Sequence, residues 1–287
     1  MDTARRSPLE SLARTYTRAI PENPADDGLF GSGSIVWRVN RDRCFPLAGM
    51  RSLMIQALHP LAMAGVAQHS TWKQDPFGRL AATSSYLLTT TYGDTRSALE
   101  AAAWVRRIHV HVRGTDPETG LPYSAEDPAL LLWVHAGMVD SVVEVVRRYG
   151  RPLSDEDADR YVSEMVRFAE IVGVPREDVP TSTQELRVYL ESVELRQATP
   201  AAKEAIAIVL EPPDLDTDTR ELWRELGQVA VGTLPEWARQ MYGFEEPPAA
   251  VMEREPVRQL LGALDLAFES LPGVLETRER IELRSRR

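Results

Sequence analysis

The amino-acid sequence predicts an all-α protein with a single domain. Apolar residues recur at helical spacing in segments that Pro, Gly or Asp residues separate, and no alternating run is long enough for a sheet. The predicted helices differ in length and share no motif, so a repeat solenoid is not expected. With 287 residues, of which 43% are hydrophobic, the chain can bury one large core or two closely packed halves.

Composition argues against several classes of function. A formal net charge of −10 speaks against nucleic-acid binding, which needs a basic surface. Cys44 is the single cysteine, so an intrachain disulfide cannot form, and cysteine-based zinc or iron–sulfur sites lack ligands. We expect Cys44 to be a small buried apolar residue.

The first 45 residues read as an arm or a lid outside the core. They are largely polar, and Pro21, Pro24 and the Gly31–Ser34 segment interrupt regular structure. The N-terminal end lacks the apolar stretch of a signal peptide. Elsewhere His, Gln or Arg interrupts each apolar stretch before the roughly 20 residues that a membrane span needs. We therefore expect a soluble, cytoplasmic protein with no membrane span.

A helical domain is expected over residues 46–245. Apolar residues from Met50 to Gly65 predict a first long, mostly buried helix, which Pro60 would break or kink. A second helix is expected over about 76–92. A third, with Asp94 or Thr95 as its cap, is expected over about 95–114.

The predicted helices of the second half begin after a turn-rich loop. Ser124 and Asp127 form an approximate capping box for a helix over about 126–149. Six more helices are expected over about 153–172, 182–195, 200–210, 217–232, 234–242 and 256–271, two of them with caps at Ser154 and Ser182. Residues 246–287 are expected to pack on the domain or extend from it, with the arginine-rich segment 278–287 as a frayed, solvated helix.

All five histidines lie in the first half of the chain, at positions 59, 69, 109, 111 and 135. A functional centre is therefore expected between residues 50 and 140. His59 and His69 are expected to pack or to make hydrogen bonds at helix ends, although either could approach a cofactor.

His109 is the leading candidate for a metal ligand. On a regular helix Arg106 and Arg113 share its face, which suits haem: imidazole binds iron, and guanidinium groups pair with propionates. His111 points to a different face. The alternative is that His109 is an ordinary hydrogen-bonded core or surface histidine.

Two further features could line a cavity. Arg79, Thr83, Tyr86 and Thr90 form a polar stripe on an otherwise apolar helix, which is either a cavity wall or a solvated face. His135 lies in an apolar segment that disfavours its charged form, so it is either a neutral core histidine or part of the cavity wall.

Other familiar chemistries lack their motifs. The sequence contains no His-Glu-x-x-His signature and no Glu three residues before a histidine, which argues against zinc-protease and ferritin-type diiron sites. Gly31-Ser-Gly-Ser34 is an incomplete dinucleotide-binding fingerprint, and Gly-x-Ser-x-Gly is absent.

A series of short segments in this order resembles the family of rubber oxygenase (latex clearing protein) and the fungal oxygenase that cleaves the farnesyl chain of a mycophenolic acid precursor. The segments are Gln56-Ala-Leu-His-Pro60, His69-Ser70 with Asp75-Pro76, Arg79-Leu-Ala-Ala-Thr83, Tyr92-Gly93-Asp94, Ile108-His-Val-His-Val-Arg-Gly-Thr115, Tyr123-Ser-Ala-Glu-Asp-Pro128 and Leu131-Leu-Trp-Val-His135. They span residues 50–140 and continue more loosely to about 245.

The resemblance implies a globin-like helical core around a b-type haem, with His109 as the proximal iron ligand. It also implies that Arg79 and Thr83 are the arginine and threonine of the distal-side motif. Rubber oxygenase has a lysine before that threonine that can cap the iron, and this chain has Ala82. The distal site is therefore expected to be open or water-bound, and the substitution argues against rubber cleavage itself.

The leading hypothesis is a haem b-dependent oxygenase that activates dioxygen to oxidise or cleave an apolar, isoprenoid-like or aromatic small molecule. Arg79 and Thr83 would orient oxygen or its water network, and Met54, Leu80, Leu87 and Met138 would admit the substrate. A redox partner and self-association into a homo-oligomer are further candidates. Two alternatives stay open: a haem carrier or sensor without turnover, and a haem-less helical interaction protein.

Overall fold

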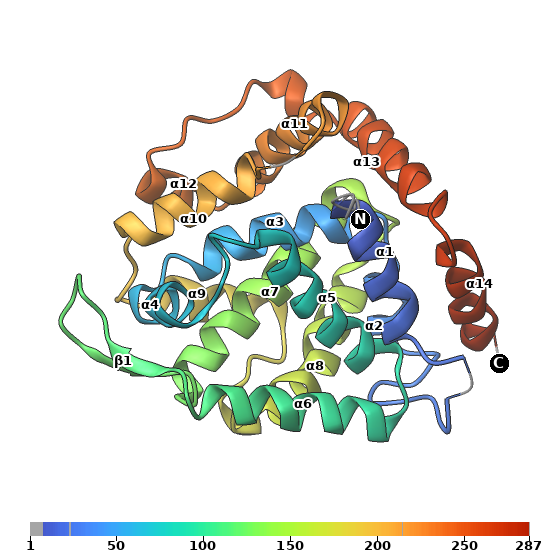
Figure 1. Ribbon diagram of the computed structural model, residues 1–287, viewed down its shortest axis with the longest axis horizontal. Helices are drawn as coiled ribbons and strands as arrows, with labels where there is room; N and C mark the ends of the chain where they lie inside the picture. Colours follow the sequence, from blue (N-terminus) through green and yellow to red (C-terminus); the bar gives the residue numbers. More distant parts are fainter. Residues whose placement is uncertain (1–7, 23, 214, 287) are drawn as a thin grey trace, which may run out of the picture.

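The computed structural model describes residues 8–22, 24–213 and 215–286. Within these residues the protein is built from α-helices, two short 3-10 helices and one small hairpin, which confirms the all-α prediction (Figure 1). The first half contains α1 (Pro8–Ala19), α2 (Ile35–Asn40), α3 (Phe45–Gln56), α4 (Pro60–His69), α5 (Pro76–Tyr92), α6 (Thr95–His109), β1 (Arg113–Thr115) and β2 (Pro122–Ser124). The second half contains α7 (Pro128–Tyr149), α8 (Asp155–Val172), η1 (Arg176–Asp178), α9 (Thr183–Ser192), α10 (Pro200–Leu210), α11 (Thr217–Thr233), α12 (Glu236–Tyr242), η2 (Ala249–Met252), α13 (Arg254–Glu269) and α14 (Val274–Ser285).

The core is organised around α3 and α7, which lie against each other in the middle of the molecule (Figure 1). At their contact Gly137 of α7 permits a close approach, because a Cβ atom there would lie 3.0 Å from Cγ2 of Ile55. The indole nitrogen of Trp133 donates a hydrogen bond to the carbonyl oxygen of Gln56 at 3.0 Å. The contact between α3 and α7 is therefore fixed in two ways. The missing side chain of Gly137 leaves room for Ile55, and Trp133 makes a hydrogen bond to the backbone of α3.

Helix α7 is long and apolar enough to cross a membrane by length and composition alone. However, 67% of its most apolar stretch is buried inside the protein, where it packs against α3, α8 and α9. The core helix of a globular protein passes the same test, so the finding is weak evidence for a span. The expectation of no membrane span stays a prediction.

The predicted first long helix is in fact two helices. Helix α3 ends at Gln56, and the amides of Leu58 and His59 turn back to the carbonyls of Ile55 and Gln56. Pro60 then occupies the first position of α4, where a missing N–H costs nothing. The proline therefore starts a helix and does not kink one.

The helix predicted over 95–114 ends at His109, and an antiparallel hairpin follows it. In the register of β1 and β2, Gly114 pairs with Tyr123. A Cβ atom at Gly114 would lie 2.8 Å from the Tyr123 hydroxyl, so a glycine is required for this contact. Gln68 of α4 holds the hairpin by donating to the carbonyl of Thr115 at 3.0 Å. The placement of Arg113 on the helical face of His109 was therefore wrong.

Both ends of the chain are more closely packed than predicted. Residues assigned to the N-terminal arm enter the core, since Val36, Trp37 and Cys44 are fully buried. The segment 278–287 is not a frayed, solvated helix over the residues described, because Ile281 is buried. Val274, two turns earlier on α14, is buried too, so one face of this helix is apolar although its composition is basic.

The predicted caps are largely confirmed. The side chains of Asp94, Ser154 and Ser182 each accept a hydrogen bond from the backbone amide three residues later. At α7 the capping box is replaced by a simpler arrangement, in which Asp127 is the cap and accepts from the amide of Ala129.

Arg51 connects three helices in the core. Its Nη1 atom donates to the carboxylate of Asp140 at 2.7 Å and to the hydroxyl of Ser141 at 2.8 Å, both on α7. Its Nε atom donates to the carbonyl of Thr233 at the end of α11, at 2.9 Å. Only 3% of the arginine side chain is exposed, so these partners replace the water that the charge has lost.

Replacing Arg51 with Ala should destabilise the protein by about 3–5 kcal/mol, because Asp140 and the Thr233 carbonyl would lose their buried partner. The measurement is the free energy of unfolding from urea denaturation. Arg96→Ala is the control, because its ion pair with Glu100 is exposed and should contribute well under about 1 kcal/mol. Equal losses in the two variants would contradict the assigned role of Arg51.

Candidate functional site

Helix α5 presents the predicted polar stripe, starting from a well-capped end. Asp75 accepts a hydrogen bond from the amide of Gly78 at 2.8 Å, which fixes the first turn. The Thr83 hydroxyl donates to the carbonyl of Arg79 at 3.1 Å and leaves its oxygen free to accept another bond. The Arg79 guanidinium has no hydrogen bond or ion pair within the described residues. It is accessible, yet surrounding protein lowers its pKa by desolvation.

The inner half of the stripe is buried. Tyr86 keeps a buried hydroxyl that finds no partner among the described residues, and burial raises the pKa of this phenol. The nearby charge of Arg106 opposes that shift in part. Thr90 is fully buried and donates to the Tyr86 carbonyl at 2.8 Å. The stripe is therefore buried at its Tyr86 and Thr90 end, whereas Arg79 and Thr83 at the other end are exposed.

His109 is the last residue of α6 and lies near Arg79. Desolvation lowers the pKa of His109 first, the positive charge of Arg79 lowers it further, and Glu126 raises it. Its Nδ1 atom is buried without a partner, and no hydrogen bond of the described residues involves either ring nitrogen. The structure therefore holds a neutral imidazole whose nitrogens are not engaged, which is the form that binds a metal ion.

The two arginines expected beside His109 have different surroundings. Arg106 lies on α6 and donates to the carbonyl of Ile171 near the end of α8. Arg113 lies on the hairpin, where its Nε atom donates to the Val110 carbonyl at 2.9 Å. Its guanidinium is also 3.8 Å from the carboxylate of Glu126. Both side chains stay largely exposed, so each retains free donors for an anionic group.

His135 of α7 is linked to the α5 stripe through Phe168 of α8. The His135 and Phe168 rings are stacked with centroids 6.1 Å apart, and the centroids of the Tyr86 and Phe168 rings are 5.3 Å apart. Burial lowers the pKa of His135 to about 4, and its Nδ1 atom has no partner within the described chain. His135 is therefore a neutral, buried group, as the apolar segment predicts.

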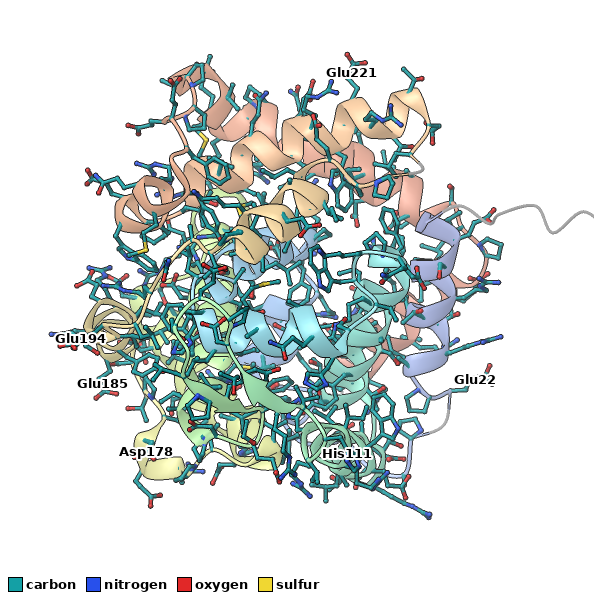
Figure 2. The ribbon with its side chains drawn as sticks, turned by 60° about the vertical axis from the view of Figure 1, so that its left-hand side comes forward. Glu22, His111, Asp178, Glu185, Glu194 and Glu221 are labelled. Atoms are coloured by element: carbon teal, nitrogen blue, oxygen red, sulfur yellow. The ribbon has the colours of Figure 1, made fainter. Side chains whose placement is uncertain are left out.

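The other three histidines have different roles. His69 shares a 3.1 Å hydrogen bond with the Tyr123 hydroxyl, which fixes α4 to the hairpin. His59 is buried beside Trp133, and desolvation lowers its pKa while Asp127 raises it. His111 is exposed and appears at the surface beyond the end of α6 (Figure 2).

The structure adds residues that the sequence did not suggest. Phe168 lies outside the quoted segments, and its ring stacks on that of His135. Glu126 lies within the segment Tyr123–Pro128 but had no assigned role, and its charge raises the pKa of His109. No local signal could have identified Phe168, because an aromatic residue on an amphipathic helix is ordinarily core. Met54 belongs to the core, fully buried, with its carbonyl accepting from the Tyr242 hydroxyl at 2.7 Å. It therefore does not face an open cavity as expected.

Uncovered apolar side chains occur on the two central helices. Leu53 of α3 is 38% exposed and Val134 of α7 is 40% exposed, although their helical neighbours are buried. Gln56 joins the two helices here by donating to the Val134 carbonyl at 3.0 Å. Single exposed apolar side chains are ordinary on a protein surface, so these two do not by themselves mark a binding place.

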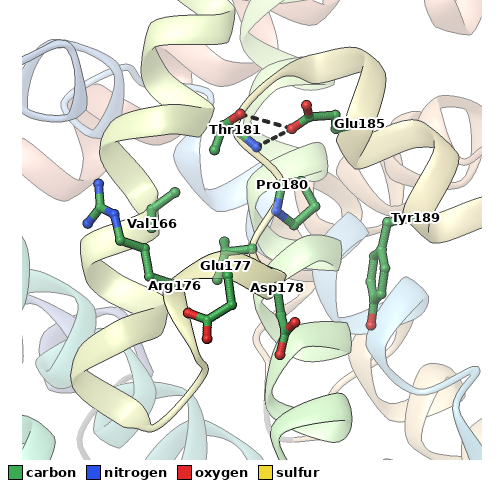
Figure 3. A pocket seen from close by; sticks show the side chains of 9 residues that line it. Val166, Arg176, Glu177, Asp178, Pro180, Thr181, Glu185 and Tyr189 are labelled. Atoms are coloured by element: carbon green, nitrogen blue, oxygen red, sulfur yellow. Dashed lines mark hydrogen bonds between the residues drawn. The ribbon is translucent and has the colours of Figure 1, made fainter.

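Neither of two grooves on the described surface is lined by the predicted iron ligand, His109. One of about 620 Å³ lies between α8, η1 and α9 (Figure 3). There Glu185 accepts from the amide and the hydroxyl of Thr181, so this carboxylate already has its partners. The second, of about 310 Å³, lies between α1 and α5 and includes Ala82.

A directly coordinated metal site is not formed by the described side chains, which contain no group of three or more His, Cys, Asp or Glu able to hold an ion. A haem differs from such a site, because the porphyrin supplies four ligands and the protein needs to supply one.

Comparison with known proteins identifies the family. Residues 37–265 match the family described as ER-bound oxygenase mpaB/B'/Rubber oxygenase, catalytic domain. The chain belongs to this family. No curated protein and no solved structure matches the chain. The match covers α3 to α12, with parts of α2 and α13, and so contains His109, Arg79, Thr83 and His135.

The depressed pKa of His135 predicts a pH dependence of stability. In the haem-free protein His135 stays neutral down to about pH 4, whereas in the unfolded chain it binds a proton below about 6.5. The unfolded state therefore binds more protons in this window. His135 should lower the free energy of unfolding by about 1.4 kcal/mol per pH unit as pH falls through it.

Urea denaturation between pH 7 and 4 measures this slope. His135→Gln should make the curve flatter than that of the unsubstituted protein, whereas the exposed His111→Gln should leave it unchanged. An identical slope in all three proteins would exclude a buried, neutral His135.

Proposed function

We propose that this family member is a haem b-dependent oxygenase that uses dioxygen to oxidise or cleave an apolar small molecule. The observation that carries the proposal is His109: a neutral imidazole at a helix end, with both ring nitrogens free of hydrogen bonds in the described structure. Membership of an oxygenase family supports the reaction class. Haem and the identity of the substrate are our additions to it.

The residues around His109 fit a haem in charge as well as in ligand type. Haem is an apolar disc with two carboxylates, so its site needs one metal ligand, an apolar wall and cationic groups at one edge. Arg106 and Arg113, which flank His109 in the sequence, would bind the propionates. Each keeps unused donors beside its present backbone partner. His135 and Phe168 would form part of the wall.

A haem held by one histidine supplies an iron atom with a free coordination position at which dioxygen can be activated. Arg79 and Thr83 would then orient oxygen or the water around it. Thr83 is suited to accept a hydrogen bond, because its own proton is held by the Arg79 carbonyl. Arg79 is suited to donate, because its guanidinium has no competing partner in the described chain.

Ala82 leaves the position before Thr83 without a side chain that could reach a metal. The distal side would therefore be open to water or substrate.

The first test is the absorption spectrum after reconstitution with haemin. We expect a Soret band in the unsubstituted protein and in His111→Ala, and a band that is lost or strongly shifted in His109→Ala. His111 is the matched control, because it is two residues away and exposed. A full, unchanged spectrum in His109→Ala would show that another residue holds the iron.

The second test is oxygen uptake by the reduced, haem-loaded protein with isoprenoid and aromatic compounds. An oxygenase consumes oxygen in proportion to the product formed. We expect Arg79→Ala and Thr83→Val to retain the Soret band and to lose at least about tenfold in turnover, which corresponds to roughly 1.4 kcal/mol of transition-state stabilisation. Reversible oxygen binding with no consumption for any compound would instead indicate a carrier or sensor.

A further inference from the structure

The hydroxyl of Tyr86 is a polar group that the described fold does not use. Its oxygen atom is buried, and it finds no hydrogen-bond partner among the described residues. Buried tyrosine hydroxyls ordinarily have a partner. Two others in this chain do: the Tyr161 hydroxyl donates to Oδ1 of Asn40 at 2.9 Å, and the Tyr242 hydroxyl donates to the Met54 carbonyl at 2.7 Å.

A missing partner is not enough to mark a binding group, because the indole nitrogens of Trp37 and Trp72 are also buried without one. The position of Tyr86 distinguishes it from them. It lies seven residues after Arg79 and three after Thr83, on the same face of α5. The two proposed reactive side chains and the unused hydroxyl therefore belong to one face of one helix.

The Tyr86 ring is held in place without the help of its hydroxyl. Its centroid lies 5.3 Å from that of Phe168 on α8, and the Phe168 ring stacks in turn on His135. On the backbone side, the Thr90 hydroxyl donates to the Tyr86 carbonyl at 2.8 Å. Packing thus fixes the ring, and the hydroxyl remains free to donate.

The charged group nearest in effect to this hydroxyl is Arg106 of α6. The positive charge of Arg106 lowers the pKa of Tyr86, although burial raises it by more. Both residues meet the same end of α8: Arg106 donates to the Ile171 carbonyl, and Phe168, which contacts the Tyr86 ring, is three residues earlier. A neutral donor from α5 and a cation from α6 therefore come together there.

The charge effects divide the α5 face into two parts. At its exposed end, Arg79 acts on His109, the proposed iron ligand. At its buried end, Tyr86 is affected by Arg106 and not by Arg79. Arg106 lies one helical turn before His109 on α6. The Tyr86 hydroxyl is thus associated with the edge of the proposed haem site and not with the position at which oxygen would bind.

The chemistry of this pair suits a carboxylate. Burial keeps the phenol protonated, so it donates a hydrogen bond, and the guanidinium adds a positive charge and further donors. Arg106 uses one nitrogen for the Ile171 carbonyl and has others left. A carboxylate accepts from both groups at once, through its two oxygen atoms.

We propose that Tyr86 and Arg106 together bind one carboxylate of the ligand held between α5 and α6, with the phenol as the neutral donor and the guanidinium as the charged one. In the haem of the proposed function, this carboxylate is a propionate. The inference rests on that function for the identity of the ligand. It adds a binding residue to the site and gives Arg106 a specific partner.

The test compares haemin with its dimethyl ester, which has the same ring and iron but no carboxylate. Both dissociation constants are measured by titration of the Soret band. Tyr86→Phe should weaken the binding of haemin about three- to tenfold more than that of the ester, because a hydrogen bond to a charged acceptor is the stronger one. Tyr161→Phe is the matched control and should leave the preference for haemin unchanged, because its hydroxyl already binds Asn40.

The shared carboxylate is tested by combining variants. Arg106→Ala should reduce the preference for haemin as well, and the double variant with Tyr86→Phe should lose less than the product of the two single losses, because both groups bind the same acceptor. Arg107→Ala is the control for Arg106. It is the next residue on α6, it is exposed, and it should change the preference less than about twofold.

The haem-free protein gives a second readout. Tyr86→Phe removes a buried hydroxyl that has no partner in the described fold, so the equilibrium constant for unfolding in urea should fall at least about fivefold. Excess haemin should reduce or reverse this advantage, because only the tyrosine can bind the propionate. Tyr161→Phe should raise the unfolding constant, because Asn40 loses its partner.

Each contrary outcome has its own meaning. Equal losses of haemin and ester in Tyr86→Phe, or no loss of either, would overturn the carboxylate site while the Soret band still supports the proposed function. A haem-free Tyr86→Phe protein that is less stable than the unsubstituted one would show that the hydroxyl serves the fold, which also overturns it. A missing Soret band in the unsubstituted protein would overturn the proposed function, and this inference with it.

Discussion

The buried guanidinium of Arg51 fixes the frame on which the site depends. It binds two side chains of α7 and the last turn of α11 from a position on α3, so three helices share one charge. A buried arginine tolerates few arrangements, because each unpaired N–H would carry a desolvation cost. The register of α3 against α7 is thereby set, with the close approach at Gly137 as the second constraint. The side of α7 that bears His135 is then directed toward α8 and α5.

The residues of the proposed site are positioned by where their helices begin and end, more than by hydrogen bonds between their side chains. Arg79 lies in the first turns of α5, where Asp75 caps the helix, and His109 closes α6 just before the hairpin. Neither of these two side chains makes a hydrogen bond or ion pair in the described structure, so both are available for the ligand that we propose. Burial and the positive charge of Arg79 both lower the pKa of His109, so both favour the neutral imidazole.

Helix-capping residues and prolines in the sequence determined which helices could be predicted. Helices α5 and α10 were located correctly because each begins with a proline at its first position, directly after a capping residue. The break between α3 and α4 was missed because Leu58 continues the apolar spacing through a turn. The hairpin was missed because three-residue strands are too short to show alternation. For the site, spacing identified His109, His135 and the α5 stripe, but the meeting of Tyr86 and His135 at Phe168 depends on how α8 packs, which no local pattern encodes.

Buried polar atoms without a partner occur in several parts of the described chain, among them Trp37, His59 and Trp72, and three of them belong to residues at the site that we propose. Within the described chain, Tyr86, His109 and His135 each keep a buried nitrogen or oxygen without a partner. Each such group costs about 1–3 kcal/mol in a folded protein, and three of them on neighbouring helices amount to a large fraction of a typical stability. Their retention, next to an unpaired guanidinium on α5, is consistent with a fold that gives up stability to keep a binding site ready.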